Sequence, residues 1–238
     1  MSVKRPLVVS IEGNIGAGKS TILDALKSRI NINGVFMQEP VNVWETVKDE
    51  SNKTILMKYY ENPEKYAFPF QIMAYTTRLH ALKSCIENNS NCDVIVCERS
   101  LEADKNIFAK MLYDDSMIEC VSYQIYNMLY NNTANAYRAD AIIYMRADPK
   151  ECLFRIHKRL RNGENNISME YLESCHKYYD EWLMAEHDGD HGGDHDRNNI
   201  PILVLDVNDN VDYNEDNGVG QKWILQISQF INGIIENK

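Results

Sequence analysis

The chain has 238 residues, of which 44% are hydrophobic and 25% charged, and its formal net charge is −10. These values are typical of a soluble globular protein, and the length fits one α/β domain with a sizeable core. The negative charge argues against nucleic acid as a partner, because contacts to phosphate backbones need clustered Lys and Arg. A small neutral substrate fits the composition better.

Targeting and redox signals are sparse. No apolar run approaches the ~20 residues of a membrane span, and the first predicted strand begins so early that we expect no signal peptide and no membrane partner. The six cysteines show no C-x-x-C spacing and are interpreted as reduced thiols. We therefore expect a cytoplasmic protein.

A glycine-rich motif, G-x-x-x-x-G-K-S, lies at residues 13–20, between an apolar run at 7–11 and a helix-like run at 21–30. This order is that of a phosphate-binding loop, whose backbone N–H groups face phosphates at the positive end of the next helix. Lys19 is expected to reach the β- and γ-phosphates, and Ser20 to ligate magnesium. A turn that merely needs glycine would leave Lys and Ser unexplained. The nucleotide-binding residues are therefore predicted to be Gly13, Asn14, Ile15, Gly16, Ala17, Gly18, Lys19, Ser20 and Thr21.

Two further apolar runs end in acidic residues. Residues 34–37 lead to Glu39, and residues 93–97 lead to Glu98 and Arg99. Ligands of open α/β sheets bind at the carboxyl ends of strands, so Glu39 is a candidate base, although a lone Glu can equally be a solvated loop carboxylate. Glu98 is in position to hold magnesium, and Arg99 to orient the reacting oxygens.

Helical spacing covers residues 51–88, as two helices that join near 62–63, and residues 116–131. Gln71 and Arg78 interrupt the apolar face of the first segment; taken alone, such residues are more often surface or core polar groups than ligand contacts. The second segment carries an apolar stripe that is either core or a dimer face. The stripe consists of Val121, Ile125, Met128 and Leu129.

The C-terminal half continues the alternation of strands and helices. Strands are predicted at 141–145 and 202–205, and helices from 149, at 169–187 and at 221–235. Five strands that alternate with helices predict a parallel α/β sheet. The glycine-rich segment 188–199 is predicted to be a flexible surface loop; its recurring histidines could bind a metal, but the glycines disfavour the helix that would align them.

Three arginines, Arg155, Arg159 and Arg161, precede a predicted helix break at 162–163. A solvated basic helix is the simplest interpretation. In an acidic protein with a phosphate loop, however, such a cluster also suits a lid that closes over a transferring phosphate.

In combination, these motifs make the chain similar to the deoxyribonucleoside kinase family over nearly its whole length. The resemblance rests on residues 13–21, Glu39-Pro40-Val41 with Trp44, Tyr60-Glu61-x-Pro63, Phe70-Gln71 with Arg78, Glu98-Arg99-Ser100, Arg155-Ile156-x-x-Arg159-x-Arg161-x-x-Glu164 and Leu205-Asp206-Val207-Asn208. It implies a P-loop kinase fold with an Arg-rich lid at about 155–166, in a single domain spanning 1–238. It also implies a homodimer through the helices at 107–131.

The activity implied by the resemblance is transfer of the γ-phosphoryl of ATP to the 5′-hydroxyl of a deoxynucleoside. Glu39 would accept the hydroxyl proton, while Arg99 would hold that oxygen and restrain Glu39. Ser20 and Glu98 would serve Mg²⁺. The arginines Arg155, Arg159 and Arg161 would stabilise charge on the γ-phosphoryl.

The resemblance also implies where the substrates bind. Tyr60 and Glu164 would hold the 3′-hydroxyl, and Gln71 would pair with the base. Aromatic rings would pack around that base, and a late segment would lie over the adenine of ATP. The rings are those of Trp44, Phe70 and Phe108, and the late segment is Asp206, Val207 and Asn208.

Base preference is predicted from two residues. Family members that take deoxycytidine or purine deoxynucleosides carry an Arg and an Asp beside the base, and Arg78 and Asp104 match those positions. Such a pair serves an exocyclic amino group and crowds a thymine methyl, so deoxycytidine or purines are predicted over thymidine. Two departures from the family pattern are Gly163, where a Glu is usual, and Leu160, where a small residue is usual.

Two other functions compete with this interpretation. A nucleoside monophosphate kinase of the thymidylate type shares the phosphate loop, but it would need basic residues to grip its substrate's phosphate where Glu39 stands. A non-catalytic scaffold on the same fold would have no need for the complete polar set at Lys19, Ser20, Glu98 and Arg99.

Overall fold

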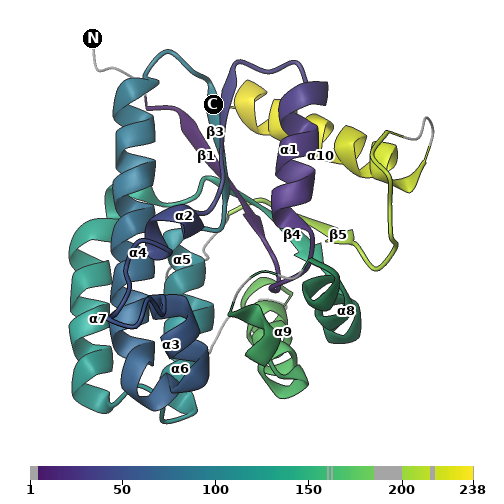
Figure 1. The fold of residues 1–238 in the computed structure, drawn as a ribbon. Helices are drawn as coiled ribbons and strands as arrows, with labels where there is room; N and C mark the ends of the chain where they lie inside the picture. Colours follow the sequence, from purple (N-terminus) through teal and green to yellow (C-terminus); the bar gives the residue numbers. More distant parts are fainter. Residues whose placement is uncertain (1–4, 160, 162, 185–199, 215–217, 238) are drawn as a thin grey trace, which may run out of the picture.

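A single parallel sheet organises the chain. The computed structural model describes residues 5–159, 161, 163–184, 200–214 and 218–237. The strands pair in the order β2-β3-β1-β4-β5, and every pairing is parallel (Figure 1). They are β1 (Leu7–Glu12), β2 (Gly34–Met37), β3 (Val94–Glu98), β4 (Ala141–Arg146) and β5 (Ile202–Asp206). The predicted five-stranded parallel α/β fold is confirmed.

Helical segments connect the strands and flank the sheet (Figure 1). Before β3 lie α1 (Lys19–Arg29), α2 (Val41–Trp44), α3 (Ile55–Glu61) and α4 (Pro63–Asn88). Between β3 and β4 lie α5 (Leu101–Ala103), the π-helix η1 (Asp104–Ala109), α6 (Lys110–Asp114), α7 (Cys120–Thr133) and the 3-10 turn η2 (Ala134–Tyr137). The remainder are α8 (Pro149–Arg159), the 3-10 turn η3 (Glu164–Asn166), α9 (Met169–Leu183) and α10 (Val219–Glu236).

The three central strands are buried on both faces, and alternate residues of each strand point to opposite sides of the sheet. Val9 of β1 belongs to a core cluster with Leu26 of α1 and Ile227 of α10. The next residue back, Val8, packs instead with Leu82 of α4. Helices α1 and α10 therefore cover one face and α4 the other, with α7 beside α4 (Figure 1).

The predicted pair of helices within residues 51–88 is confirmed, and local chemistry explains the break. The Asn62 side chain accepts a hydrogen bond from the Lys65 backbone N–H, and Pro63 occupies the first position of α4. Asn is a favoured N-cap, and Pro fits the first helical turn, where its missing N–H would lack a partner anyway.

Some boundaries differ from the predictions. The helix predicted at 116–131 begins at Cys120, and the one predicted at 169–187 ends at Leu183. Residues 101–114 form one continuous helical run, and its middle part, η1, is a π-helix and not a regular α-helix. Leu160 and the predicted flexible loop 188–199, with its histidines, lie outside the described residues.

Two glycines of the phosphate loop are required by space as well as by backbone conformation. Gly13 has φ +144°, and a Cβ there would lie 2.5 Å from the carbonyl oxygen of Met145. Gly16 has φ +82°, and its Cβ would lie 2.5 Å from the carbonyl oxygen of Cys152. The loop thus packs so closely on the end of β4 and on α8 that only glycine fits.

The described helices do not have the features of membrane spans. Within the residues that the structure describes, none of them combines the length and the apolar character that a bilayer crossing requires.

Replacing Ile143 by Ala should lower the free energy of unfolding by about 2–5 kcal/mol, because this side chain of β4 is 0% exposed and its loss leaves a cavity. Urea unfolding would measure the change. Leu225 of α10, which is 57% exposed, is the matched control, and its replacement by Ala should change the stability by no more than about 0.5 kcal/mol. Equal losses in the two variants would contradict the assigned core.

Candidate active site

A pocket of about 670 Å³, counted with its open mouth, lies at the carboxyl ends of the central strands. It brings together residues that are far apart in the sequence, from the phosphate loop to the region after α8. The predicted site residues that line it are Ile15, Gly16, Lys19, Glu39, Trp44, Tyr60, Phe70, Gln71, Arg78, Glu98, Arg99, Asp104, Phe108, Arg159, Arg161 and Glu164. One pocket thus contains polar groups suited to phosphate at one end and aromatic rings at the other.

The phosphate end is built around Lys19, the first residue of α1. Its Nζ donates a hydrogen bond to the carbonyl oxygen of Asn14, 2.8 Å away, which holds the ammonium within the loop. Burial lowers the pKa of Lys19 to about 8, and the charge of Arg99 acts in the same direction, although nearby carboxylates oppose both. The surroundings of the lysine therefore favour the binding of a negatively charged group.

Ser20 and Glu98 meet beside this lysine. The Ser20 hydroxyl donates to Oε1 of Glu98 over 3.0 Å. A hydroxyl and one carboxylate fit Mg²⁺, which usually takes one or two carboxylates and completes its shell with water and substrate phosphates. Among the described residues, no group of three or more His, Cys, Asp or Glu side chains could hold a metal by itself.

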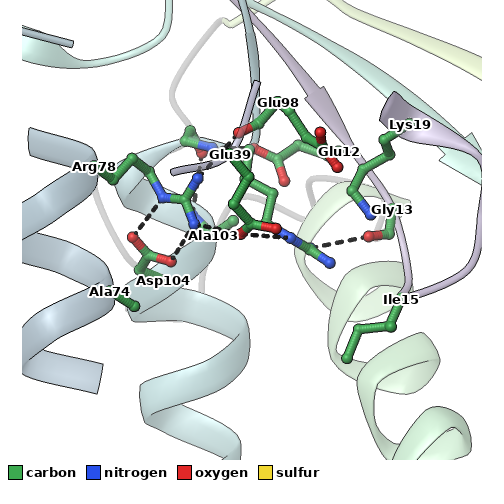
Figure 2. A network of polar contacts seen from close by, with 12 residues as sticks. Glu12, Gly13, Ile15, Lys19, Glu39, Ala74, Arg78, Glu98, Ala103 and Asp104 are labelled. Atoms are coloured by element: carbon green, nitrogen blue, oxygen red, sulfur yellow. Dashed lines mark hydrogen bonds and ion pairs between the residues drawn. The ribbon is translucent and has the colours of Figure 1, made fainter. Parts of the chain in front are cut away.

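Glu39 is held by two arginines, of which Figure 2 labels Arg78. Nη2 of Arg78 donates to Oε1 of Glu39 over 2.7 Å, and Nε of Arg99 lies 3.4 Å from the same oxygen. Burial would raise the pKa of the Glu39 carboxyl, but Arg78, Arg99 and Lys19 outweigh it and lower that pKa to about 2. Glu39 is therefore a carboxylate at neutral pH, as an acceptor of a proton must be.

Arg99 fixes the position of the phosphate loop relative to Glu39. Its Nη1 donates to the carbonyl oxygen of Gly13 over 3.0 Å and to the hydroxyl of Tyr179. Its guanidinium carbon lies 4.8 Å from the centre of the Phe108 ring. The backbone of Arg99 has φ +64°, which is unusual for a residue other than glycine and is a form of strain that clusters at functional sites.

Arg78 and Asp104 form a buried ion pair rather than two independent groups. Nε of Arg78 donates to Oδ2 of Asp104 over 2.8 Å, and Nη2 approaches Oδ1 at 3.3 Å (Figure 2). Burial raises the pKa of Asp104, and Arg78 opposes that rise. The π-turn of η1 places Asp104 and Phe108 in the same pocket.

The other end of the pocket is aromatic. The Phe70 ring stacks on Tyr59 at 4.8 Å and meets the edge of Trp44 at 5.5 Å. Nε1 of Trp44 donates to Thr77, which fixes the indole. Next to these rings, Oε1 of the buried Gln71 has no hydrogen-bond partner among the described residues. An amide in an apolar wall with a free acceptor is suited to a ligand that offers a donor.

A third part of the pocket comes from the region after α8. Glu164 accepts from Nη2 of Arg159 at 2.7 Å and from Nη1 of Arg161 at 3.3 Å. Gly163, the predicted departure from the family pattern, lies in this region with a backbone conformation that favours glycine. Its φ is +91°, and an added Cβ would lie 3.1 Å from Cγ of Met57.

Some predicted residues do not reach this pocket. Nη2 of Arg155 donates to the carbonyl oxygens of Val207, Asn208 and Asp209, at 2.9, 3.1 and 3.0 Å. The structure thus joins Arg155 to the segment predicted to cover adenine, and Arg155 does not line the pocket that Arg159 and Arg161 line. The roles of Arg155 and of residues 206–208 toward ATP stay predictions.

Sequence reasoning missed several residues of the site. Glu12 ends β1 and accepts from the Ser100 backbone N–H over 2.8 Å; burial raises its pKa, although Arg99 opposes the rise. The strand-end rule that found Glu39 would have found it too. Tyr171 and Tyr179 come from α9, and no local signal in the sequence marks them.

The fold and the pocket define a nucleotide-binding α/β protein with a phosphate-binding loop and a second, partly aromatic subsite. The family model for deoxynucleoside kinases matches residues 9–232, and the chain belongs to that family.

Relatives agree with this assignment. Deoxycytidine kinase of Bos taurus is 34% identical over 223 residues, which cover 84% of each chain. A probable deoxycytidine kinase of fowlpox virus is 31% identical, with 94% of this chain and 87% of the relative covered. The mitochondrial deoxyguanosine kinase of Xenopus laevis is 27% identical, with 98% and 92% covered.

Nucleotide affinity should fall as the pH rises through the pKa of Lys19, which is about 8. Bound phosphates favour the charged form of Lys19. Above its pKa, Lys19 of the free protein must take up a proton before ATP binds, so the Kd for ATP should rise about tenfold by pH 9. Calorimetry between pH 7.5 and 9 would measure it. A Lys19→Arg control keeps its charge throughout and should show no such trend; an unchanged Kd in the wild type would contradict the assigned pKa.

Proposed function

We propose that this protein transfers the γ-phosphoryl group of ATP to the 5′-hydroxyl of a deoxynucleoside, as part of nucleotide salvage. One observation supports the proposal above all. Glu39, an ionised carboxylate, stands between the phosphate loop and a pocket end whose aromatic rings and free amide suit a nucleobase. A nucleoside bound there would point its 5′-hydroxyl toward both Glu39 and the phosphates of ATP.

The residues divide the chemistry as phosphoryl transfer requires, because this reaction depends on positioning and charge stabilisation more than on a strong base. Glu39 accepts the hydroxyl proton as the oxygen bonds to phosphorus, and Arg99 holds that oxygen. Lys19 binds the β- and γ-phosphates. Arg159 and Arg161, in a lid at about 155–166, exchange Glu164 for the transferring group, while Tyr60 and Glu164 hold the 3′-hydroxyl.

Ser20 and Glu98 are proposed as the metal ligands, because their side-chain oxygens lie 3.0 Å apart. Mg²⁺ bound there would neutralise charge on the phosphates of ATP. Residues 206–208 are proposed to border the adenine, and Arg155 donates hydrogen bonds to the carbonyl oxygens of Val207 and Asn208 in that segment.

Deoxycytidine or a purine deoxynucleoside is the proposed acceptor. The Arg78–Asp104 ion pair lies in the pocket with Gln71, so the base meets a fixed carboxylate and an amide instead of an apolar surface. A carboxylate favours the exocyclic amino group of cytosine or adenine and offers nothing to the methyl group of thymine. The names of the relatives, deoxycytidine and deoxyguanosine kinases, support the same choice.

Steady-state phosphorylation of deoxycytidine, deoxyadenosine, deoxyguanosine and thymidine, with Mg²⁺ and ATP, tests the proposal. We expect turnover led by deoxycytidine or a purine. If thymidine gave the highest turnover, the proposed kinase activity would stand, but the proposed role of Arg78 and Asp104 in base choice would be refuted. Phosphorylation of thymidylate without that of any nucleoside would favour a monophosphate kinase.

A Glu39→Gln variant should lose about 10²–10⁴-fold in kcat, because the amide cannot accept the proton, yet it should bind ATP normally. Product formation and calorimetry would give the two values. Wild-type kcat in the variant would show that Glu39 is not the base. Full function in cells without kinase activity would revive the scaffold alternative.

We further propose a homodimer through α7, in a single-domain cytoplasmic protein. Val121, Ile125 and Met128 lie on α7 and are 60%, 50% and 66% exposed, so these three residues of the stripe face outward, whereas Leu129 packs against a core cluster. An apolar face of this kind on a small protein suits contact with a second copy. The six cysteines are free thiols, in accord with a reducing compartment.

An Ile125→Asp variant should be monomeric, because a charge in the centre of the stripe cannot be buried without a partner. Light scattering coupled to size-exclusion chromatography would measure the mass. Leu225→Asp, at a similarly exposed apolar position on α10, is the control and should keep the wild-type mass. A monomeric wild type would refute the dimer.

A further inference from the structure

Arg78 is the most completely engaged arginine of the pocket. It lies in the middle of α4 and is 2% exposed. Its three nitrogens donate to groups on three other segments: Asp104 of η1, the carbonyl oxygen of Glu98 at the end of β3, and Glu39 after β2. Each nitrogen of this guanidinium donates to one of these acceptors. Arg78 is therefore a fixed, structural part of the site.

Arg78 lies closer to Glu39 than Arg99 does, although Arg99 is the arginine that was expected to restrain Glu39. Nη2 of Arg78 lies 2.7 Å from Oε1 of Glu39, whereas Nε of Arg99 lies 3.4 Å from the same oxygen. Both arginines reach Oε1. Among the described residues, no hydrogen bond reaches Oε2 of Glu39. One oxygen is thus fixed, and the other can turn to a substrate hydroxyl.

We propose that Arg78 is a positioning residue for Glu39, and that through the shared guanidinium it couples recognition of the base at Asp104 to the placement of the proton acceptor. This inference rests on the proposed function. It assigns Arg78 a part in the rate of phosphoryl transfer in addition to its part in base choice.

The physical reason is the planar shape of the guanidinium. Nη2 approaches both Oε1 of Glu39 and Oδ1 of Asp104, at 2.7 and 3.3 Å. A shift of Asp104 toward or away from the base must rotate this rigid fork and move the donor that holds Glu39. A displacement of about 1 Å at a reacting group costs up to about 100-fold in rate.

The charge of Arg78 also affects the ionisation of Glu39. The other charged or titratable groups that face Glu39 come from the phosphate loop, α3, the end of β3, η1 and the region after α8. They are Lys19, Tyr60, Glu98, Arg99, Asp104 and Arg161. Because Lys19 and Arg99 remain when Arg78 is removed, Glu39 would still ionise, but at a higher pH.

A pair of variants isolates this role. Asp104→Ala removes the carboxylate beside the base and leaves Arg78 on Glu39. Arg78→Met/Asp104→Ala removes both members of the buried ion pair, which avoids stranding one buried charge and therefore favours a folded protein. The difference between these two variants is the effect of Arg78 on Glu39. Each is assayed with its best nucleoside at saturation, over a range of pH.

We expect Asp104→Ala to change the order of the nucleosides, with no upward shift of the acid limb of kcat. The double variant should lose a further 10–100-fold or so in kcat relative to Asp104→Ala, and its acid limb should lie about 1–3 pH units higher. Equal kcat and equal acid limbs in the two variants would overturn the proposal, because Arg78 would then act on the base alone. A wild type that turns over no nucleoside would instead refute the proposed function, and this inference with it.

Discussion

The buried ion pairs around Glu39 are the interaction on which the site depends. Two arginines, from the middle of α4 and from the end of β3, converge on a single carboxylate oxygen. Neither guanidinium could stand in this pocket without carboxylates, and Glu39 would not stay ionised there without the guanidiniums. Each charged group therefore needs the others to stay ionised in the pocket, and the ion pairs connect α4 to the ends of the strands.

The parallel sheet makes this convergence possible. Since all five strands run the same way, the residues that follow β1, β2 and β3 emerge at one edge, whatever their separation along the chain. Buried strands fix these positions from both faces. The side chains that do chemistry thus stand on rigid supports, and the strained backbone of Arg99 is held by the packing around it.

Electrostatics give the two ends of the pocket different tasks. Around Lys19 the buried cations favour an added anion, as the lowered pKa of that lysine indicates. Around Phe70 the walls are rings, with the free acceptor of Gln71 as a polar group for orientation. A ligand with phosphate at one end and a heterocycle at the other satisfies both ends, which is the division of a nucleoside kinase between donor and acceptor.

The sequence by itself determined the elements and much of the chemistry. The motif at 13–20, apolar runs that end in Glu39 and Glu98, and strand–helix alternation predicted the parallel fold and the phosphate end. These signals are local, because strand ends and glycine loops are defined by neighbouring residues. The family resemblance added the residues of the nucleoside end.

Only the tertiary structure decided which of these groups touch. The family resemblance implied that Arg99 would restrain Glu39; the fold places Arg78 closer to the same oxygen. It also turns Arg155 toward residues 207–209 and brings Tyr179 of α9 to Arg99. Such contacts depend on how α4, α8 and α9 pack on the sheet. Packing between segments that are distant in the sequence cannot be predicted from an apolar pattern that repeats every three or four residues.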